Sequence, residues 1–270
     1  MSSEQERAIR SRVQAQFGDK ADAYATSAIH ADPAHLVRLL DLVQPQPGWR
    51  VLDVATGAGH TAHALARHVA SVVATDLTPP MVAKARALAQ EKGLANVSAL
   101  AADAGALPFA PASFDLVTVR LAPHHFPDIG RFLAEVHRIL PPGGRLAVVD
   151  NVVPGSLHSG KKARLQNEAG RYINAFERLR DPSHVRCLSI YEWRQAFYEA
   201  GLTIEQEETE WKWLDFGPWA ARMNVTEPDL TRLRVLLLRA PNAVLEFLTP
   251  EIRGDTMRFR LSEALFVVRK

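Results

Sequence analysis

Short apolar segments alternate with helix-forming segments between residues 50 and 153. Five stretches are expected as strands because their apolar residues are nearly continuous: 50–55, 71–77, 96–103, 114–121 and 145–153. Three stretches between them are expected as helices: 60–69, 79–93 and 129–140. This alternation predicts an α/β fold in which a doubly wound, mostly parallel sheet carries helices on both faces, with right-handed crossovers.

The segments on either side of this alternation follow a different pattern. Residues 3–28 are polar and helix-prone, and residues 33–43 are expected as an amphipathic helix. After Pro154 the pattern predicts a long strand at 202–214 and helices at 160–180, 191–200, 216–224, 228–238 and 243–247. A last strand is expected at 258–270, where it inserts back into the sheet. We therefore expect a single domain over residues 1–270.

Composition and charge exclude several classes of protein. The 32 Lys and Arg residues nearly balance the 30 Asp and Glu residues, and the net charge is +2, so no nucleic-acid partner is expected. No stretch approaches the roughly 18 apolar residues that a membrane span needs, and residues 1–10 lack the apolar core of a secretion signal. Cys187 is the only cysteine, which excludes a disulfide within the chain. We expect a cytoplasmic protein without a membrane span.

The turn after the first strand carries glycine at positions 57 and 59 and alanine at position 62. This G-x-G-x-x-A spacing, with Asp76 at the end of the second strand, matches the fingerprint of dinucleotide-binding sites. The turn alone therefore allows two interpretations. One is an oxidoreductase that uses a nicotinamide cofactor, and the other is a nucleoside site of a different kind.

Acids in or at the ends of three successive strands favour the second interpretation. Asp53 lies inside the first strand, where its charge is costly unless it serves the N–H groups of the turn or a cationic ligand. Asp76 can accept from ribose hydroxyls, and Asp103 either reads an adenine edge or caps a surface helix. Ligands of open α/β sheets bind at the carboxyl ends of the strands. The site therefore suits a cationic nucleoside such as S-adenosylmethionine.

Several ordered motifs carry a resemblance to a known family. They are VLDVATGAG at residues 51–59, ATDLTPPM at 74–81, DAGALPF at 103–109, FDLV at 114–117 and LPPGGRL at 140–146. With these motifs the chain resembles the class I S-adenosylmethionine-dependent methyltransferases over roughly residues 35–153, and most of all the branch of the ubiquinone/menaquinone biosynthesis C-methyltransferases. The resemblance implies a seven-stranded sheet in the order 3-2-1-4-5-7-6, with strand 7 antiparallel and formed by residues 258–270.

The single domain is expected to have four parts. Residues 1–34 would form an N-terminal lid, and residues 35–153 the cofactor-binding core. Residues 154–257 would form a partly helical cap over the methyl acceptor, before the last strand at 258–270. Tyr24 is a candidate for contact with the cofactor because it belongs to this lid, and Phe17 is the second aromatic residue there.

Roles for single residues follow from their places in the motifs. Gly57 and Gly59 would let the backbone approach the methionine part of S-adenosylmethionine, and Asp76 would hold its ribose hydroxyls. Asp103 would take the adenine amino group, Ala104 a ring nitrogen, and the backbone of Arg120 would lie near the ammonium group. The remaining cofactor-binding candidates from these motifs are Asp53, Thr56, Leu77 and Met81.

Methyl transfer needs a general base only when the acceptor is a neutral hydroxyl or an activated carbon. His124 and His125 follow the fourth strand and are the catalytic candidates, with ordinary loop histidines as the alternative. His60 and His63 are expected on a solvated helix face, and no metal site is expected. The polar residues at 180–186 either bind an anionic acceptor or form a turn between helices.

Trp211 and Trp213 alternate along the long expected strand and so share one of its faces. We expect them in the core or on a face between two copies of a homodimer, with an aromatic acceptor pocket as the alternative. The predicted activity is methyl transfer from S-adenosylmethionine to a small-molecule acceptor, with aromatic and quinol-like compounds among the candidates. A nicotinamide-dependent oxidoreductase and a non-catalytic cofactor-binding protein on the same scaffold are the alternatives.

Overall fold

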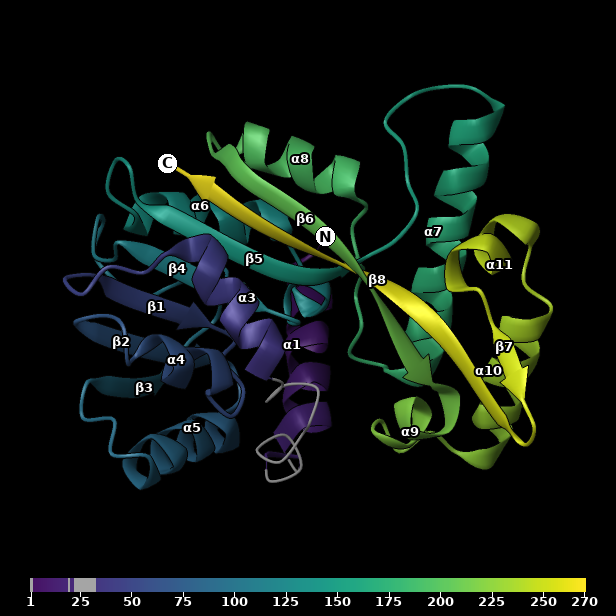
Figure 1. Cartoon of the computed structure of the whole chain (residues 1–270), viewed down its shortest axis with the longest axis horizontal. Helices are drawn as coiled ribbons and strands as arrows, with labels where there is room; N and C mark the ends of the chain where they lie inside the picture. Colours follow the sequence, from purple (N-terminus) through teal and green to yellow (C-terminus); the bar gives the residue numbers. More distant parts are fainter. Residues whose placement is uncertain (1, 19, 22–32) are drawn as a thin grey trace.

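The computed structural model describes residues 2–18, 20–21 and 33–270. Tyr24 lies outside the described residues. The described strands are β1 (Arg50–Val54), β2 (Ser71–Asp76), β3 (Val97–Ala101), β4 (Leu116–Arg120), β5 (Arg145–Val152), β6 (Thr203–Asp215), β7 (Glu251–Arg253) and β8 (Thr256–Arg269). They form one sheet in the order β3-β2-β1-β4-β5-β8-β6, with β7 paired to β8 (Figure 1).

The pairing confirms the predicted architecture. Strands β1 to β5 pair in parallel, whereas β8 is antiparallel to both of its long neighbours, β5 and β6. In the expected order, β8 takes the place of strand 7. The short strand β7 was not predicted, because its three residues give too short a pattern to recognise.

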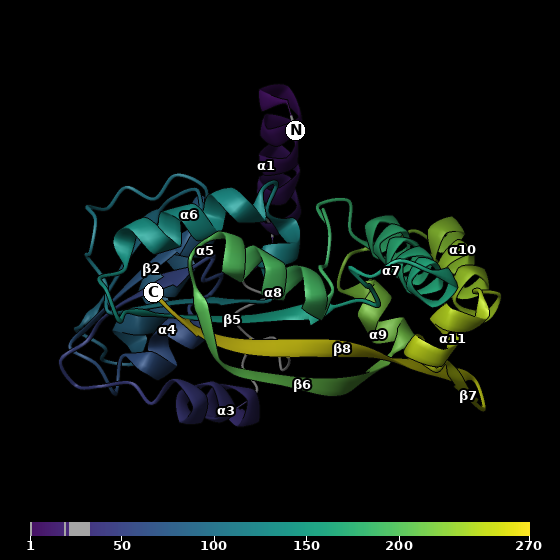
Figure 2. The ribbon, with the colours of Figure 1, turned by 90° about the horizontal axis from the view of Figure 1, so that it is seen from above.

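Helices cover both faces of the sheet. The helices that the structure describes are α1 (Ser3–Gly18), α3 (Pro33–Val43), α4 (His60–Leu65), α5 (Pro79–Glu91), α6 (Ile129–Ile139), α7 (Lys161–Arg180), α8 (Ile190–Glu199), α9 (Phe216–Ala221), α10 (Glu227–Leu238), α11 (Asn242–Leu248) and the 3-10 helix η1 (Pro123–His125). Apolar side chains of α3, α4 and α5 form the core on one face, and those of α6 and α8 form the core on the other. Figure 2 shows α6 and α8 on one side of the sheet and α3 and α4 on the opposite side.

Local sequence explains where several of these helices begin and end. Proline residues open α5, and Gly93 follows its last turn with a φ of 66°. Asp128 accepts a hydrogen bond from the backbone N–H of Arg131 and caps α6. The apolar face of α6 packs against the sheet. Ser189 and Glu192 form a capping box at the start of α8.

The strands β6 and β8 continue beyond the parallel strands into a second region (Figure 1). There α7, α9, α10 and α11 pack around the antiparallel strands β6 and β8 in an apolar cluster of their own. Within the segment expected to form a cap, α8 packs instead on the main sheet through Trp193 and Phe197. The two regions are therefore joined by continuous, hydrogen-bonded strands.

Two aromatic residues of β6 are exposed, which excludes one of the positions expected for them. Trp211 and Trp213 are 44% and 42% exposed, so the expectation of core packing is wrong for both. The guanidinium of Arg260 lies 4.0 Å from the ring centroid of Trp211, and that of Arg258 lies 4.2 Å from the ring centroid of Trp213. An arginine on the neighbouring strand thus covers each ring without burying it.

Candidate active site

A cavity of about 230 Å³ opens at the carboxyl ends of β1, β2, β3 and β4. Among its lining residues are most of the predicted site residues: Asp53, Thr56, Gly57, Asp76, Leu77, Met81, Asp103, Ala104, Arg120, His124 and His125. Gly59 is absent from the lining. The fold thus brings together residues from four strand ends and the loops that follow them, as expected of an open α/β sheet.

The two glycines of the turn have different roles. Gly57 has a φ of 55°, and a Cβ built on it would meet no atom within 4 Å. This residue therefore keeps open a space that belongs to the cavity. Gly59 has a φ of 90°, and a Cβ there would lie 2.7 Å from ring atoms of His63. Gly59 is thus required by packing beneath the turn.

Asp53 is buried and holds two hydroxyl groups. One carboxylate oxygen accepts from Oγ1 of Thr56 at 2.5 Å, and the other accepts from Oγ1 of Thr118 at 2.6 Å. Burial raises the pKa of Asp53, and the hydroxyl hydrogen bonds and the charge of Arg120 oppose that rise. Asp53 therefore links the glycine turn to β4 through its hydrogen bonds with Thr56 and Thr118.

Asp76 is also buried, and its carboxylate accepts two backbone hydrogen bonds. Oδ2 accepts from the N–H of Gly57 at 2.9 Å, and Oδ1 accepts from the N–H of Thr78 at 2.8 Å. Burial raises the pKa of Asp76, and these hydrogen bonds oppose the rise. Each carboxylate oxygen has about two lone-pair sites, so capacity for further donors remains.

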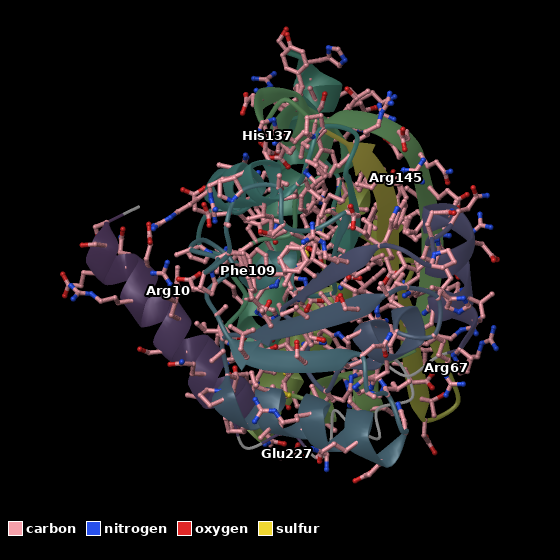
Figure 3. All side chains as sticks on the ribbon, turned by 90° about the vertical axis from the view of Figure 1, so that its left-hand side faces the viewer. Arg10, Arg67, Phe109, His137, Arg145 and Glu227 are labelled. Carbon is pink, nitrogen blue, oxygen red and sulfur yellow. The ribbon has the colours of Figure 1, made fainter. Side chains whose placement is uncertain are left out.

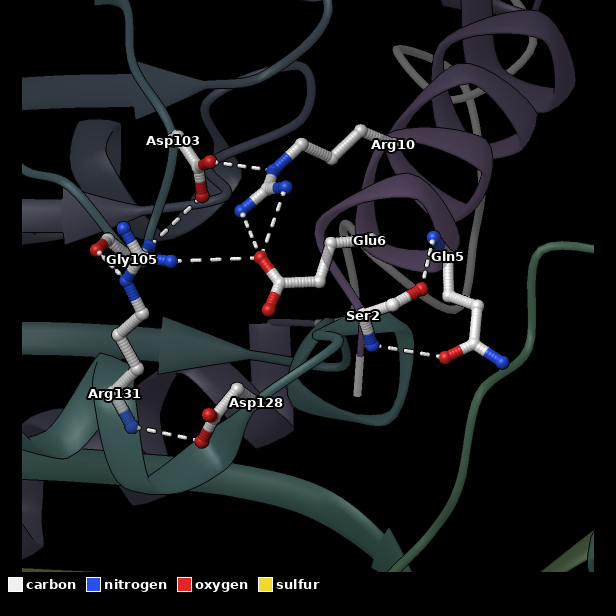
Figure 4. Close-up of polar contacts among 8 residues, drawn as sticks. All are labelled: Ser2, Gln5, Glu6, Arg10, Asp103, Gly105, Asp128 and Arg131. Carbon is white, nitrogen blue, oxygen red and sulfur yellow. Dashed lines mark hydrogen bonds and ion pairs between the residues drawn. The ribbon is translucent and has the colours of Figure 1, made fainter.

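Asp103 follows β3 and lies at the end of the cavity next to the N-terminal helix α1. Its Oδ1 accepts from the N–H of Gly105 at 2.9 Å, and its Oδ2 accepts from Nε of Arg10 at 2.6 Å (Figure 4). Arg10 projects from α1 toward the body of the domain (Figure 3). A residue 93 positions away in the sequence thus completes the surroundings of Asp103.

His124 forms a buried pair with Asp150 of β5. Its Nδ1 lies 2.5 Å from Oδ1 of Asp150, and because an ionised carboxylate can only accept, Nδ1 carries the proton. Burial alone would lower the pKa of His124. The charge and hydrogen bond of Asp150, with smaller contributions from Asp181 and Glu177, outweigh burial and raise that pKa above 6.5.

The remaining nitrogen of His124, Nε2, makes no hydrogen bond with any residue that the structure describes, and the side chain keeps 11% exposure at the cavity wall. In the neutral ring this atom carries the free lone pair. The pair can therefore take up a proton from the cavity.

The neighbouring histidines differ from His124 in the direction of their pKa shifts. Burial lowers the pKa of His125 to about 3, and its Nδ1 lies 3.1 Å from the carbonyl oxygen of Ser183. Burial also lowers the pKa of His184, whose Nε2 lies 2.8 Å from Oδ1 of Asn174. Both rings are thus neutral near pH 7 and hold the loop at residues 180–186 in place.

The half of the cavity beyond His124 is lined by apolar residues and by charged residues, among them the ion pairs Arg180–Glu177 and Lys212–Glu263. Its apolar lining residues are Val152, Val153, Ile173, Leu214, Trp219, Met223 and Leu261. Trp219 stacks on Phe176, and the guanidinium of Arg180 lies 4.7 Å from the ring centroid of Trp219. This half therefore combines apolar contact surface with charged side chains that are paired with one another.

Sequence reasoning missed three functional candidates. Asp150 is an isolated acid in the apolar run of β5, a signal like the one that pointed to Asp53. Arg10 and Glu177 stand in polar helices, where nothing distinguishes them from surface residues.

The expectation of a solvated face for His63 is wrong. This residue is buried, and its Nε2 lies 3.0 Å from the carbonyl oxygen of Ala85. Within the described ranges, no group of three or more His, Cys, Asp or Glu side chains is placed to hold a metal ion. Nor is any described helix both long and apolar enough to cross a membrane.

Comparisons with known proteins agree with this geometry. Residues 52–148 match the model of a family described as a methyltransferase domain. The uncharacterized methyltransferase YcgJ of Bacillus subtilis is 35% identical over 207 residues, which cover 76% of this chain and 78% of that protein. The crystal structure of YcgJ superposes with a TM-score of 0.80 at 30% identity and covers 87% of this chain and 97% of that chain. A demethylmenaquinone methyltransferase of Thermus thermophilus is 44% identical over 115 residues, 42% of this chain and 52% of that protein.

The chain belongs to the S-adenosylmethionine-dependent methyltransferases. The site fits this cofactor, because Gly57 leaves open space at the turn, Asp76 keeps free lone pairs and the acids suit a cationic ligand. A pyrophosphate would meet the same acids unfavourably. The nicotinamide interpretation of the glycine turn is therefore set aside.

Proposed function

We propose that the chain methylates an uncharged, largely apolar small molecule and that His124 takes a proton from the reacting group. The observation that carries this proposal is the buried His124–Asp150 pair, which lies between the strand-end acids and the apolar residues around Trp219. The acceptor group is a hydroxyl or an acidic carbon, because only such groups need a base.

The chain's own residues do three things in this reaction. The apolar pocket around Trp219 binds the acceptor and excludes water, which strengthens every polar contact inside it. The walls of the cavity align the acceptor with the methyl group, and such alignment is the main contribution to an in-line displacement. Nε2 of His124 receives the proton, while Asp150 fixes the ring and stabilises its cationic form.

When bound, S-adenosylmethionine supplies an electrophilic methyl group on a sulfonium leaving group. A bond forms between the acceptor atom and the methyl carbon as the carbon–sulfur bond breaks, and its electron pair stays on sulfur. The acceptor's proton goes to His124. The leaving group needs no proton, so a single base is sufficient.

For the cofactor itself we propose the roles expected from the sequence. Asp76 would bind the ribose hydroxyls and Asp103 the adenine amino group, and Gly57 would give room to the methionine part. Both carboxylates line the cavity and keep accepting capacity. The relative named a demethylmenaquinone methyltransferase supports quinol-like compounds as acceptors to be tested.

The test is a methyl-transfer screen over phenols, quinols and small acids, read by mass spectrometry, with His124→Gln and the exposed-loop control His158→Gln alongside the wild type. We expect turnover of an apolar acceptor by wild type and His158→Gln, and loss of turnover in His124→Gln. Full activity of His124→Gln with the accepted compound would refute the role of His124. Tight binding of S-adenosylhomocysteine without turnover of any acceptor would favour a non-catalytic protein.

A further inference from the structure

The N-terminal helix α1 forms one wall of the cavity. Its lining residues recur every three or four positions and so share one face of the helix: Glu6, Ile9, Arg10, Val13 and Phe17. Near the far end of α1, the ring of Phe17 packs edge-on against His125 with centroids 5.1 Å apart. The helix thus reaches from the Asp103 end of the cavity to the histidines.

Four charged side chains fasten α1 at the Asp103 end (Figure 4). Nε of Arg10 donates to Asp103, while both terminal nitrogens of Arg10 lie 3.2 Å from Oε2 of Glu6. The same oxygen of Glu6 lies 3.4 Å from Arg131, whose Nε donates to the carbonyl oxygen of Gly105 at 2.9 Å. Two positive and two negative side chains therefore form a closed, balanced network.

This network fixes the carboxylate of Asp103 without filling its accepting capacity. Each oxygen of Asp103 accepts one described hydrogen bond, from Gly105 or from Arg10, and each has about two lone-pair sites. Hydrogen bonds between charged groups are short and strong, so the contact with Arg10 restricts the rotation of the carboxylate. A second donor that enters the cavity would meet an oriented anion.

We infer that Arg10 is a positioning residue for the cofactor: it holds the Asp103 carboxylate ready for the adenine amino group. This inference rests on the proposed role of Asp103. It adds a residue of α1 to a site whose proposed cofactor contacts within the described residues otherwise come from the strand ends and the loops after them.

The experiment is calorimetric titration of S-adenosylhomocysteine into the wild type, Arg10→Met and the matched control Arg12→Met. Arg12 is exposed on the same helix, and its Nε donates to the carbonyl oxygen of Ala8 one turn earlier. We expect about a tenfold increase in Kd for Arg10→Met, the scale of one charge-assisted hydrogen bond, and no change for Arg12→Met. With saturating cofactor, kcat of Arg10→Met should stay within about twofold of wild type.

A double-mutant cycle separates positioning from a merely structural role. If Arg10 acts through Asp103, Arg10→Met should add no further loss of S-adenosylhomocysteine affinity to Asp103→Asn. Unchanged or tighter binding by Arg10→Met, or strictly additive effects, would overturn the inference. If Asp103→Asn keeps wild-type affinity, the proposed role of Asp103 fails as well, and if the wild type does not bind S-adenosylhomocysteine, the proposed function fails.

Discussion

Nδ1 of His124 lies 2.5 Å from Oδ1 of Asp150, although the two residues stand on different elements and 26 positions apart. The pair is buried, yet the pKa of His124 is raised because the carboxylate outweighs the effect of burial. His125, next in sequence and with no such carboxylate bonded to its ring, has its pKa lowered to about 3 by burial. One carboxylate on β5 therefore gives two adjacent buried histidines pKa shifts of opposite direction.

The raised pKa predicts the pH dependence of catalysis. As a base, His124 must be neutral, so kcat/KM should rise with pH and level off only above pH 6.5. In Asp150→Asn only the smaller contributions of Asp181 and Glu177 oppose burial, so the acid limb should move to lower pH while kcat falls about 100-fold. A pH–rate profile of both proteins checks this, and an unmoved acid limb would exclude Asp150 as the partner.

Asp76 should be essential for cofactor affinity. Asp76→Asn removes the negative charge and leaves one oxygen for the N–H groups of Gly57 and Thr78, so the Kd of S-adenosylhomocysteine should rise at least about tenfold. Asp115→Asn is the matched control, because Asp115 precedes β4 and accepts from the backbone N–H of Arg50 at 2.7 Å. Equal losses in both variants, measured by calorimetry, would point to general unfolding.

The two glycines of the turn should respond differently to alanine. Gly57→Ala meets open space, so it should lower the free energy of unfolding by only about 1 kcal/mol, the cost of a left-handed backbone. It should nevertheless abolish S-adenosylhomocysteine binding, because its methyl group enters the cavity. Gly59→Ala forces a methyl group against His63 and should destabilise the fold more strongly. Urea unfolding and titration of both variants check this contrast, which would fail if Gly57→Ala bound normally.

The lowered pKa of His63 predicts that the free energy of unfolding decreases in mild acid. Burial lowers its pKa from 6.5 to about 4, so the unfolded chain takes up a proton before the folded chain does. This contribution to stability is complete above pH 6.5 and is lost progressively as the pH falls toward 4. His63→Gln should flatten the pH dependence of the free energy of unfolding in that range, whereas His68→Gln, at an exposed position, should not. Identical slopes for His63→Gln and wild type would contradict the assignment.

The core sheet could be predicted from sequence because each strand carries its own signal. The expected strand at 114–121 contains β4 (Leu116–Arg120), since burial on both faces selects a continuous apolar run. His63 was misplaced because its burial depends on Ala85, a contact across 22 positions that no helical spacing reveals.

The residues of the candidate site also divide into those that a local sequence pattern reveals and those that only the folded structure reveals. His124 could be proposed because it follows a strand, but its partner Asp150 could be recognised only once β4 and β5 were paired. Arg10 lies on the polar helix α1, whose sequence does not indicate which face packs against the rest of the domain. Its contact with Asp103 depends on how the whole domain closes, which local patterns do not contain.

The long strands β6 and β8 restrict how ligands enter and leave. They are paired from Thr203–Arg269 at one end to Asp215–Arg258 at the other, so the helices of the second region and the parallel sheet share one hydrogen-bonded ribbon. A hinge motion that separated the helices of the second region from the parallel sheet would have to bend the paired strands β6 and β8 or break their hydrogen bonds. The helix α1, in contrast, is fastened at Asp103 by side-chain contacts alone. Displacing α1 from Asp103 would break side-chain contacts only, so we expect the rate of ligand exchange to depend on how fast those contacts open.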